Sequence, residues 1–262
     1  PLALKYHGHQ FGQYNPDLGD GRGFLLCQIL AKNNILWDLG TKGSGQTKYS
    51  RNGDGRLTLK GAVRELLATE FLSALAVLVR RCNGHIRIGT FQRFAYLNQK
   101  ENIEILLYHL AKNYFLNINS KSKIEILAED IFLETVKKIA DTMGKIIIAG
   151  FVHGVLNTDN FNVTGEVFDY GPWRFVEFAN PNFTAAYFEP DAALWALTQL
   201  GKSLKDFISE KRILEILNLF SAHFNTSLNK HFCWRMGIKE IDPKNLNTII
   251  KILFNDSENY KI

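Results

Sequence analysis

Residues 153–172, HGVLNTDNFNVTGEVFDYGP, place acidic and amide side chains in an order that suits one chemical task. Asp159 and Asn160 are adjacent, and Asp169 follows Asn160 by nine positions. Residues 162–168 contain short β-prone runs on either side of a glycine, a pattern that predicts a hairpin. A hairpin of this length brings its ends together, so we expect the side chains of Asn160 and Asp169 to meet. Two hard oxygen ligands suit Mg²⁺, which fills its remaining positions with water and phosphate.

Protein kinases bind Mg²⁺ with a comparable Asn and Asp, but their catalytic base has no counterpart here. A kinase loop carries an Asp two residues after its His, and the residue two positions after His153 is Val155, which accepts no proton. Asp159 is the nearby carboxylate left to act as a base. The stretch indicates a nucleotide and a metal, but not an ordinary kinase. The alternative is that these are turn residues, because Asn, Asp and Gly are common in loops.

The composition is that of a globular protein with a small positive charge. Of 262 residues, 46% are hydrophobic and 12% aromatic, and 31 Lys and Arg against 26 Asp and Glu give a net charge of +5. This length allows one large domain or two small lobes. We see no basic run for nucleic acid, no apolar run of membrane-spanning length and no signal peptide or other targeting segment. Three scattered cysteines indicate thiols in a reducing compartment, so we expect a cytoplasmic protein.

A glycine-rich turn stands near the start of the chain. Residues 17–23, DLGDGRG, precede an apolar strand expected at 24–30. Gly19 and Gly21 allow backbone N–H groups to approach phosphate oxygens, and Arg22 adds a charge-assisted contact. Because no helix follows, the turn is neither a Walker loop nor a Rossmann fingerprint. It fits a hairpin that covers a nucleotide, as in kinases, and a plain hairpin turn is the alternative.

A lysine and a helix glutamate come next, in the order of a kinase N-terminal lobe. Residues 35–39 predict a second strand with Lys42 after it, and an amphipathic helix is expected from near Leu59. In kinases the corresponding lysine binds phosphates and pairs with a Glu of the next helix. Glu65 and Glu70 are the candidates, and a solvated helix carboxylate is the alternative for either.

Together these motifs strongly resemble the selenoprotein O family of protein adenylyltransferases over about residues 5–180. The resemblance rests on YHGHQFGQ (6–13), LGDGRG (18–23), LGTKGSGQTKYSRNGDGR (39–56), AVRELLATE (62–70), HIRIGTF (85–91), GFVHGVLNTDN (150–160) and VFDYGP (167–172). It implies an α+β, protein-kinase-like two-lobe fold that is shortened relative to the family. Residues 1–98 would form a small β-rich lobe with one long helix, and residues 99–262 a mainly helical lobe.

The family's activity implies ATP as substrate, Mg²⁺ or Mn²⁺ as cofactor, and transfer of AMP to Ser, Thr or Tyr hydroxyls of partner proteins. Pyrophosphate is the leaving group, because the family binds ATP reversed relative to a kinase. A kinase-like phosphotransferase and a catalytically impaired ATP-binding, pseudokinase-like module are the alternatives. The resemblance implies no nucleic acid or membrane partner, leaves the oligomeric state open, and places the protein in mitochondria if its host is a eukaryote.

The resemblance also assigns roles to single residues. The first nucleotide-contacting turn would consist of Gly19, Gly21 and Arg22, and Lys42 would bind phosphate with Glu65 as its partner. A second ATP-binding pair would be Asp54 and Gly55, and the terminal phosphate would be held by Arg80 and Arg87. Asp159 would be the base, and the metal would be bound by Asn160 and Asp169, with Asp169 also contacting ATP. The assignment of Arg80 needs a strand, whereas residues 72–81 can also prolong the preceding helix. A register shift would make Arg81 the contact instead, or neither arginine.

Overall fold

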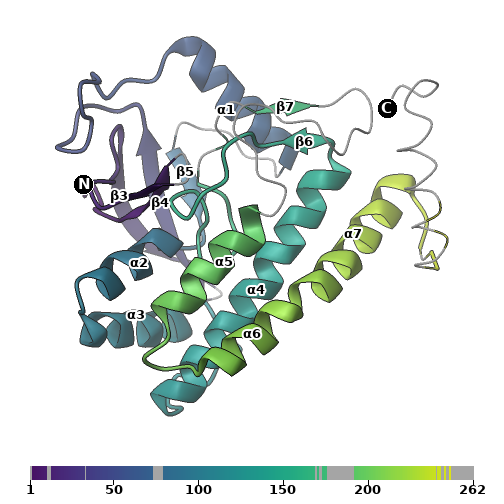
Figure 1. The fold of residues 1–262 in the computed structure, drawn as a ribbon. Coiled ribbons are helices and arrows are strands. Elements are labelled where there is room, and N and C mark those ends of the chain that lie inside the picture. Colours follow the sequence, from purple (N-terminus) through teal and green to yellow (C-terminus); the bar gives the residue numbers. More distant parts are fainter. Residues whose placement is uncertain are drawn as a thin grey trace.

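The computed structural model describes residues 2–10, 13–32, 34–72, 79–168, 170, 173–175, 192–239, 241, 242, 245 and 248 (Figure 1). At residues 10, 68–72, 79–81 and 175 it describes the backbone only. Asp169 and the side chains of Glu70, Arg80 and Arg81 therefore lie outside the described part. Within that part, small antiparallel sheets and longer helices form an α+β fold, and none of its helices has the length and hydropathy needed to cross a bilayer.

A three-stranded antiparallel sheet forms one side of the molecule (Figure 1), in the order β3 (Gly23–Leu30), β4 (Leu36–Lys42), β5 (Val79–Cys82). The strands predicted at residues 24–30 and 35–39 are present. However, β4 runs further than predicted and includes Lys42, which pairs with Gly23. The sheet thereby brings the lysine beside the first glycine-rich turn.

The helix α1 (Leu59–Leu72) begins where the sequence predicts and ends before β5. In β5 the backbone of Arg80 pairs with Gly40 of β4, so residues 72–81 are not one continuous helix. The apolar face of α1 is less buried than its periodicity suggests, since Val63, Leu66 and Leu67 are 41–53% exposed.

The helical body surrounds the long helix α4. Its helices are α2 (Ile88–Tyr96), α3 (Lys100–Asn113), α4 (Ile124–Ile148), α5 (Ala192–Ser203), α6 (Glu210–Asn218) and α7 (Phe220–Met236). Buried residues recur on α4 at helical spacing, from Leu127 through Ile131 and Ile139 to Ile146. The helices α3, α5, α6 and α7 pack around it.

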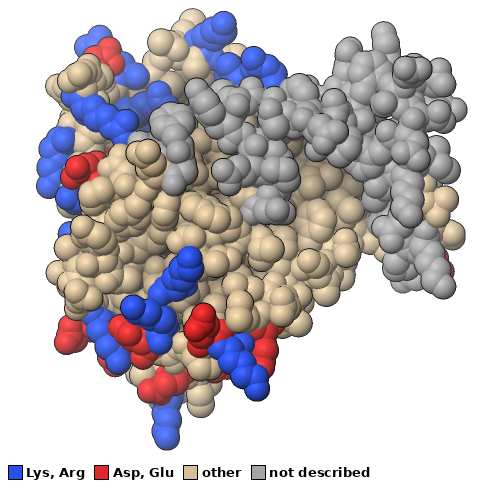
Figure 2. Space-filling view, viewed as in Figure 1, with Lys and Arg blue, Asp and Glu red and all other residues tan. Residues whose placement is uncertain are grey.

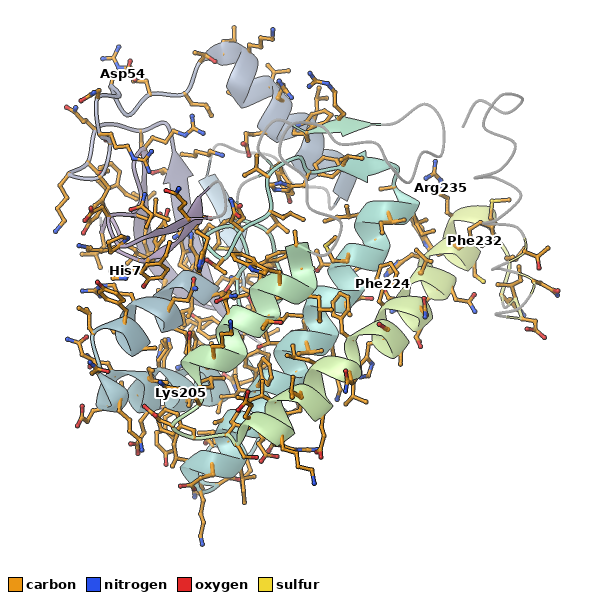
Figure 3. All side chains as sticks on the ribbon, in the orientation of Figure 1. His7, Asp54, Lys205, Phe224, Phe232 and Arg235 are labelled. Carbon is orange, nitrogen blue, oxygen red and sulfur yellow. The ribbon has the colours of Figure 1, made fainter. Side chains whose placement is uncertain are left out.

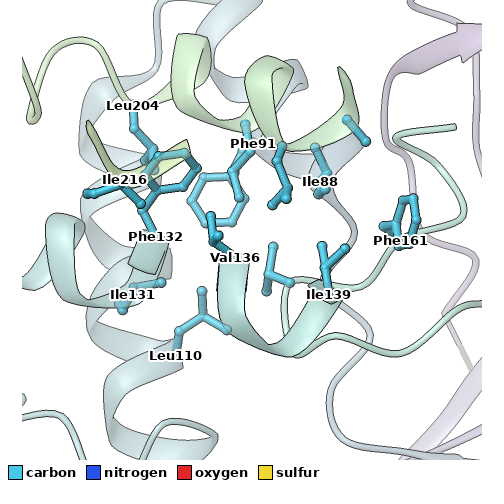
Figure 4. Packing of buried hydrophobic residues seen from close by; sticks show 14 of the residues in the cluster. Ile88, Phe91, Leu110, Ile131, Phe132, Val136, Ile139, Phe161, Leu204 and Ile216 are labelled. Atoms are coloured by element: carbon cyan, nitrogen blue, oxygen red, sulfur yellow. The ribbon is translucent and has the colours of Figure 1, made fainter. Parts of the chain in front are cut away.

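The largest buried side chains fill the space between these helices (Figure 4). Phe132 of α4, Phe91 of α2 and Leu197 of α5 are each at most 1% exposed and belong to one hydrophobic cluster. Because α2 contributes Ile88 and Phe91 to that cluster, it packs with the helical body although it precedes residue 98 in the chain.

Two further two-stranded antiparallel sheets belong to the described part of the chain. The strands β1 (Gly8–Gln10) and β2 (Gln13–Asn15) form the first, and β6 (Phe151–Val152) pairs with β7 (Arg174–Phe175) in the second. The β1 segment is attached to α2, because the amide of His7 donates to the carbonyl of Gly89 at 3.1 Å.

We predict that Gly144→Ala destabilises the protein. Glycine to alanine inside a helix normally stabilises by up to about 1 kcal/mol. A Cβ at Gly144 of α4, however, would stand 2.5 Å from Oγ of Ser227 on α7, and that hydroxyl donates to Asp141 at 2.9 Å. Overpacking of this kind costs roughly 1–3 kcal/mol, so the unfolding temperature should fall.

The matched control is Gly61→Ala in α1, where the nearest atom to the new Cβ is the flexible tip of Leu57 at 3.0 Å. Its unfolding temperature should stay the same or rise. Both can be measured by thermal unfolding followed by circular dichroism, and a more stable Gly144→Ala variant would contradict the tight α4–α7 contact.

Candidate active site

A cavity of about 490 Å³ is lined by segments that are far apart in the sequence. It is bounded by residues 17–24, by the end of β4, by the loop before α1, by His85 and Arg87, and by Asp159 with Phe168. Of the residues predicted to bind the nucleotide or act on it, those lining the cavity are Gly19, Gly21, Arg22, Lys42, Asp54, Gly55, Arg87 and Asp159. The fold therefore brings the two glycine turns, the lysine and the carboxylate to one site.

The first glycine turn is held by hydroxyl groups of the second loop. Oγ1 of Thr47 donates to the carbonyl of Asp20 at 2.6 Å, and Oγ of Ser50 donates to the carbonyl of Gly21. A Cβ at Gly19 would stand 2.4 Å from the ring of Tyr49. The glycine at this position is thus needed for packing between the two loops as well as for approach to a ligand.

The second turn depends on a left-handed backbone at Gly55. Its φ is +71°, and a Cβ there would come within 2.1 Å of the carbonyl oxygen of Gly45. Oδ1 of Asp54 accepts the amide of Arg56 at 2.9 Å, which fixes the turn. Figure 3 shows Asp54 on the outer loop, and Figure 2 shows Lys and Arg side chains gathered around this loop and α1. Such a surface favours an anionic ligand.

Lys42 forms an ion pair across the sheet–helix contact, with Nζ 2.6 Å from Oε1 of Glu65. The side chains are 23% and 21% exposed. A partly exposed pair adds at most about 1 kcal/mol to stability, so its main effect is on position. Glu65 holds the ammonium group of Lys42 at the wall of the cavity.

Arg87 is a buried cation in this site. Its guanidinium lies 2.8 Å from Oδ1 of Asp20 and 3.9 Å from the centroid of the Phe168 ring. Oδ2 of Asp20 accepts the amide of Leu4 at 3.0 Å, so both carboxylate oxygens are used. Burial alone would lower the pKa of Arg87, but the charges of Asp20 and Asp159 and the contact with Tyr6 raise it above its ordinary value. A permanent positive charge therefore faces the cavity.

Asp159 stands at the start of the predicted hairpin, which is present. Phe161 and Val167 form an antiparallel bridge, and the amide of Phe168 donates to the carbonyl of Asn160 at 2.7 Å. On its other side Asp159 is close to β1, since a Cβ at Gly8 would lie 3.3 Å from its Cβ. The N-terminal strand and the hairpin together direct this carboxylate into the cavity.

The sequence predicts Asn160 and Asp169 as ligands of Mg²⁺. Oδ1 of Asn160 accepts the amide of Asn157 at 3.0 Å, and because a carbonyl oxygen has two lone pairs, one remains for a metal. An amide oxygen with a carboxylate is a hard donor set that fits this ion. Asn160 does not line the cavity itself, and no group of three or more His, Cys, Asp or Glu in the described residues is arranged as a metal site.

Comparison with known sequences places the chain in a family. The model of the family described as "Protein adenylyltransferase SelO" matches residues 1–83 and 73–261. The chain belongs to the SelO family.

Three bacterial relatives, each named protein nucleotidyltransferase YdiU, give the extent of the similarity. The Synechocystis sp. protein is 43% identical over 82% of this chain and 53% of its own length. The relatives from Trichormus variabilis and Trichodesmium erythraeum are 37% and 38% identical over 96% of this chain, and 59% and 62% of their own lengths. The chain therefore spans somewhat more than half the length of these SelO-family proteins.

Several cavity residues were not selected from the sequence. Asp20 stands inside the predicted turn and was read only as a turn residue, and Phe168 was read as part of a strand. His85 precedes Arg87 by two positions in an extended segment, where side chains at i and i+2 share a face. From this alternation, the sequence predicts that His85 lies on the same face as Arg87 and so lines the same site.

Proposed function

We propose that this chain binds ATP with Mg²⁺ in the cavity and transfers AMP to Ser, Thr or Tyr hydroxyls of proteins, on a protein-kinase-like scaffold. The observation that carries the proposal is the convergence of Gly19, Gly21, Lys42, Arg87 and Asp159 on one cavity of about 490 Å³. A volume of this size lies in the usual range for small-molecule sites. Membership of the SelO family supports AMP as the group transferred.

The charges of the site suit pyrophosphate as a leaving group. Arg87 is fixed by Asp20, and Lys42 by Glu65, so both cations are oriented before the substrate binds. Preorganised cations stabilise charge as it develops on the leaving group, without further reorganisation. Arg87 also offers the planar donor array that matches a terminal phosphate. Bound at Asn160 and Asp169, Mg²⁺ would supply further neutralisation of the phosphates.

Asp159 is the proposed general base, since it lines the cavity and lies within electrostatic range of Arg87. It would accept the proton of the acceptor hydroxyl as the oxygen attacks the α-phosphorus. Val155 stands where a kinase carries its base, and its amide donates to Nδ1 of His153 at 3.3 Å. That hydrogen bond braces the loop and supplies no second base.

ATP labelled separately on the α- and γ-phosphates tests the proposal. We expect the α-label alone to appear on the acceptor protein when the chain, Mg²⁺ and a mixture of candidate proteins are incubated together. Transfer of the γ-label would instead identify a kinase-like phosphotransferase. Binding of Mg²⁺–ATP without transfer of either label would identify a non-catalytic, pseudokinase-like ATP-binding module.

A further inference from the structure

A cluster of polar side chains lies behind the cavity wall, among residues to which no role has been assigned. Asp38 of β4 is 1% exposed, and its Oδ1 accepts from Nε2 of Gln28 at 2.8 Å and from Oη of Tyr114 at 3.3 Å. Its Oδ2 lies 3.5 Å from Nδ1 of His85, and Sγ of Cys82 lies 3.0 Å from the same nitrogen. The cluster holds His85 by one edge of its ring.

The opposite edge of the imidazole reaches the cavity. His85 and Gly40 both line it, and a Cβ at Gly40 would stand 2.7 Å from Nε2 of His85 and 2.8 Å from its Cε1. The side chain is only 10% exposed, yet Nε2 makes no hydrogen bond to any described residue. Nε2 is not fully buried, and His85 lines the cavity. This nitrogen is therefore available to a ligand bound there.

The cluster also decides which nitrogen of the ring is available. Burial alone would raise the pKa of Asp38, but hydrogen bonds from His85, Gln28 and Tyr114 hold it below its ordinary value, so the group is a carboxylate. A carboxylate only accepts, and the thiol of Cys82 is directed to the carbonyl of Asp38 at 3.8 Å. Nδ1 therefore carries a proton and is fixed by the protein, and Nε2 is left for a ligand.

His85 lies at the arginine end of the cavity. Its ring centroid is 4.5 Å from that of Phe168, and the guanidinium of Arg87 lies on the same phenyl ring at 3.9 Å. Gly40, which contacts His85, pairs through its backbone with Arg80. The proposed function assigns Arg87 to the terminal phosphate, and the family resemblance predicts the same role for Arg80. The part of ATP expected nearest to His85 is therefore its β- and γ-phosphates.

We propose that His85 is a further nucleotide-binding residue, whose Nε2–H donates a hydrogen bond to a β- or γ-phosphate oxygen of ATP. The inference rests on the proposed function for the identity of the ligand. In this complex Nδ1–H donates to Asp38 and Nε2–H donates to the phosphate, so both ring nitrogens act as donors. Asp38 and Cys82 are positioning residues that aim this donor.

Two substitutions separate the Nε2 contact from the rest of the ring. His85→Asn keeps a polar group that can reach Asp38 but has no atom at the Nε2 position, whereas His85→Gln places an amide N–H near that position. Dissociation constants for Mg²⁺–ATP and Mg²⁺–AMP can be measured by calorimetry on the 262-residue chain. We expect His85→Asn to weaken ATP binding about tenfold, as for one charge-assisted hydrogen bond, with AMP binding unchanged. His85→Gln should recover part of the loss.

Equal losses for ATP and AMP, or no loss for ATP, would overturn the inference. A second measurement needs no variant: in the ¹⁵N-labelled wild-type chain, the Nε2 resonance of His85 should shift on addition of Mg²⁺–ATP and stay in place with Mg²⁺–AMP. An unchanged resonance in the presence of bound ATP would also overturn it. Because both experiments measure binding, a wild-type chain that binds ATP but transfers no AMP would refute the proposed function alone.

Discussion

Asp159→Asn is expected to reduce AMP transfer by about 100-fold or more while leaving Mg²⁺–ATP binding nearly intact. An amide is close in size to the carboxylate but cannot accept the proton of the acceptor hydroxyl, and general-base catalysis contributes about 10²–10⁴-fold. The substitution also removes a negative charge close to Arg87, which should strengthen rather than weaken attraction of the triphosphate. Transfer can be measured with α-labelled ATP, and ATP affinity by calorimetry on the same preparation.

The matched control for that experiment is Asp206→Asn. Asp206 is an exposed carboxylate between α5 and α6 in the helical body and does not line the cavity, so the charge change is the same and transfer should be unaltered. If the Asp159→Asn variant transfers AMP at the full rate, Asp159 is not the general base. The rate would then depend mainly on how the site positions the acceptor.

Local patterns were sufficient to predict much of this site. The glycine turns and the hairpin predicted at residues 162–168 are specified by residues close together in the sequence, because only certain residue types adopt their backbone angles. The helix α4 is also specified locally, because its buried residues repeat at helical spacing over 25 positions. Lys42 was placed by its order relative to a strand and a helix, whereas the choice of Glu65 over Glu70 came from the family resemblance.

Contacts between distant side chains were not predictable in the same way. The hydroxyls of Thr47 and Ser50 hold the first turn, but nothing in their own neighbourhood indicates a partner near Gly21. Asp38 was read as an ordinary strand residue, and its burial depends on donors from β3 and from the residue after α3. Such partners are fixed only when the tertiary fold brings the segments together, so periodicity and motif spacing carry no signal for them.

The burial of the apolar residues of α1 was also not predictable from the sequence. Val63 and Leu67 have the spacing of a core-facing helix, and periodicity predicts that they are buried. In the described part of the chain they are 44% and 53% exposed. Periodicity identifies the face of a helix that is apolar, whereas the burial of that face depends on whether another element covers it.

Arg87→Met is expected to cost about 3–5 kcal/mol of unfolding free energy, the range for breaking a buried ion pair by removing one partner. The methionine fills much of the volume above Phe168, but it leaves the carboxylate of Asp20, which is 9% exposed, without its counter-ion. ATP binding should fall as well, because the cation proposed to bind the terminal phosphate is lost. Urea unfolding followed by tryptophan fluorescence gives the free energy directly.

The double variant Asp20→Asn/Arg87→Met separates the charge effect from the packing effect. Asparagine can still accept the amide of Leu4, which now bonds to Asp20 at 3.0 Å, and it carries no charge. If the cost of Arg87→Met comes from the uncompensated carboxylate, the double variant should recover a large part of the stability but none of the ATP affinity, because the phosphate-binding cation is still missing. Arg212→Met is the surface comparison. The exposed side chain of Arg212 pairs with the exposed carboxylates of Glu129 and Glu215 at 2.9 and 3.0 Å, and its loss should change stability little. An Arg87→Met variant as stable as Arg212→Met would show that the buried pair does not hold the site together, and the preorganisation on which the proposed chemistry depends would have to come from elsewhere.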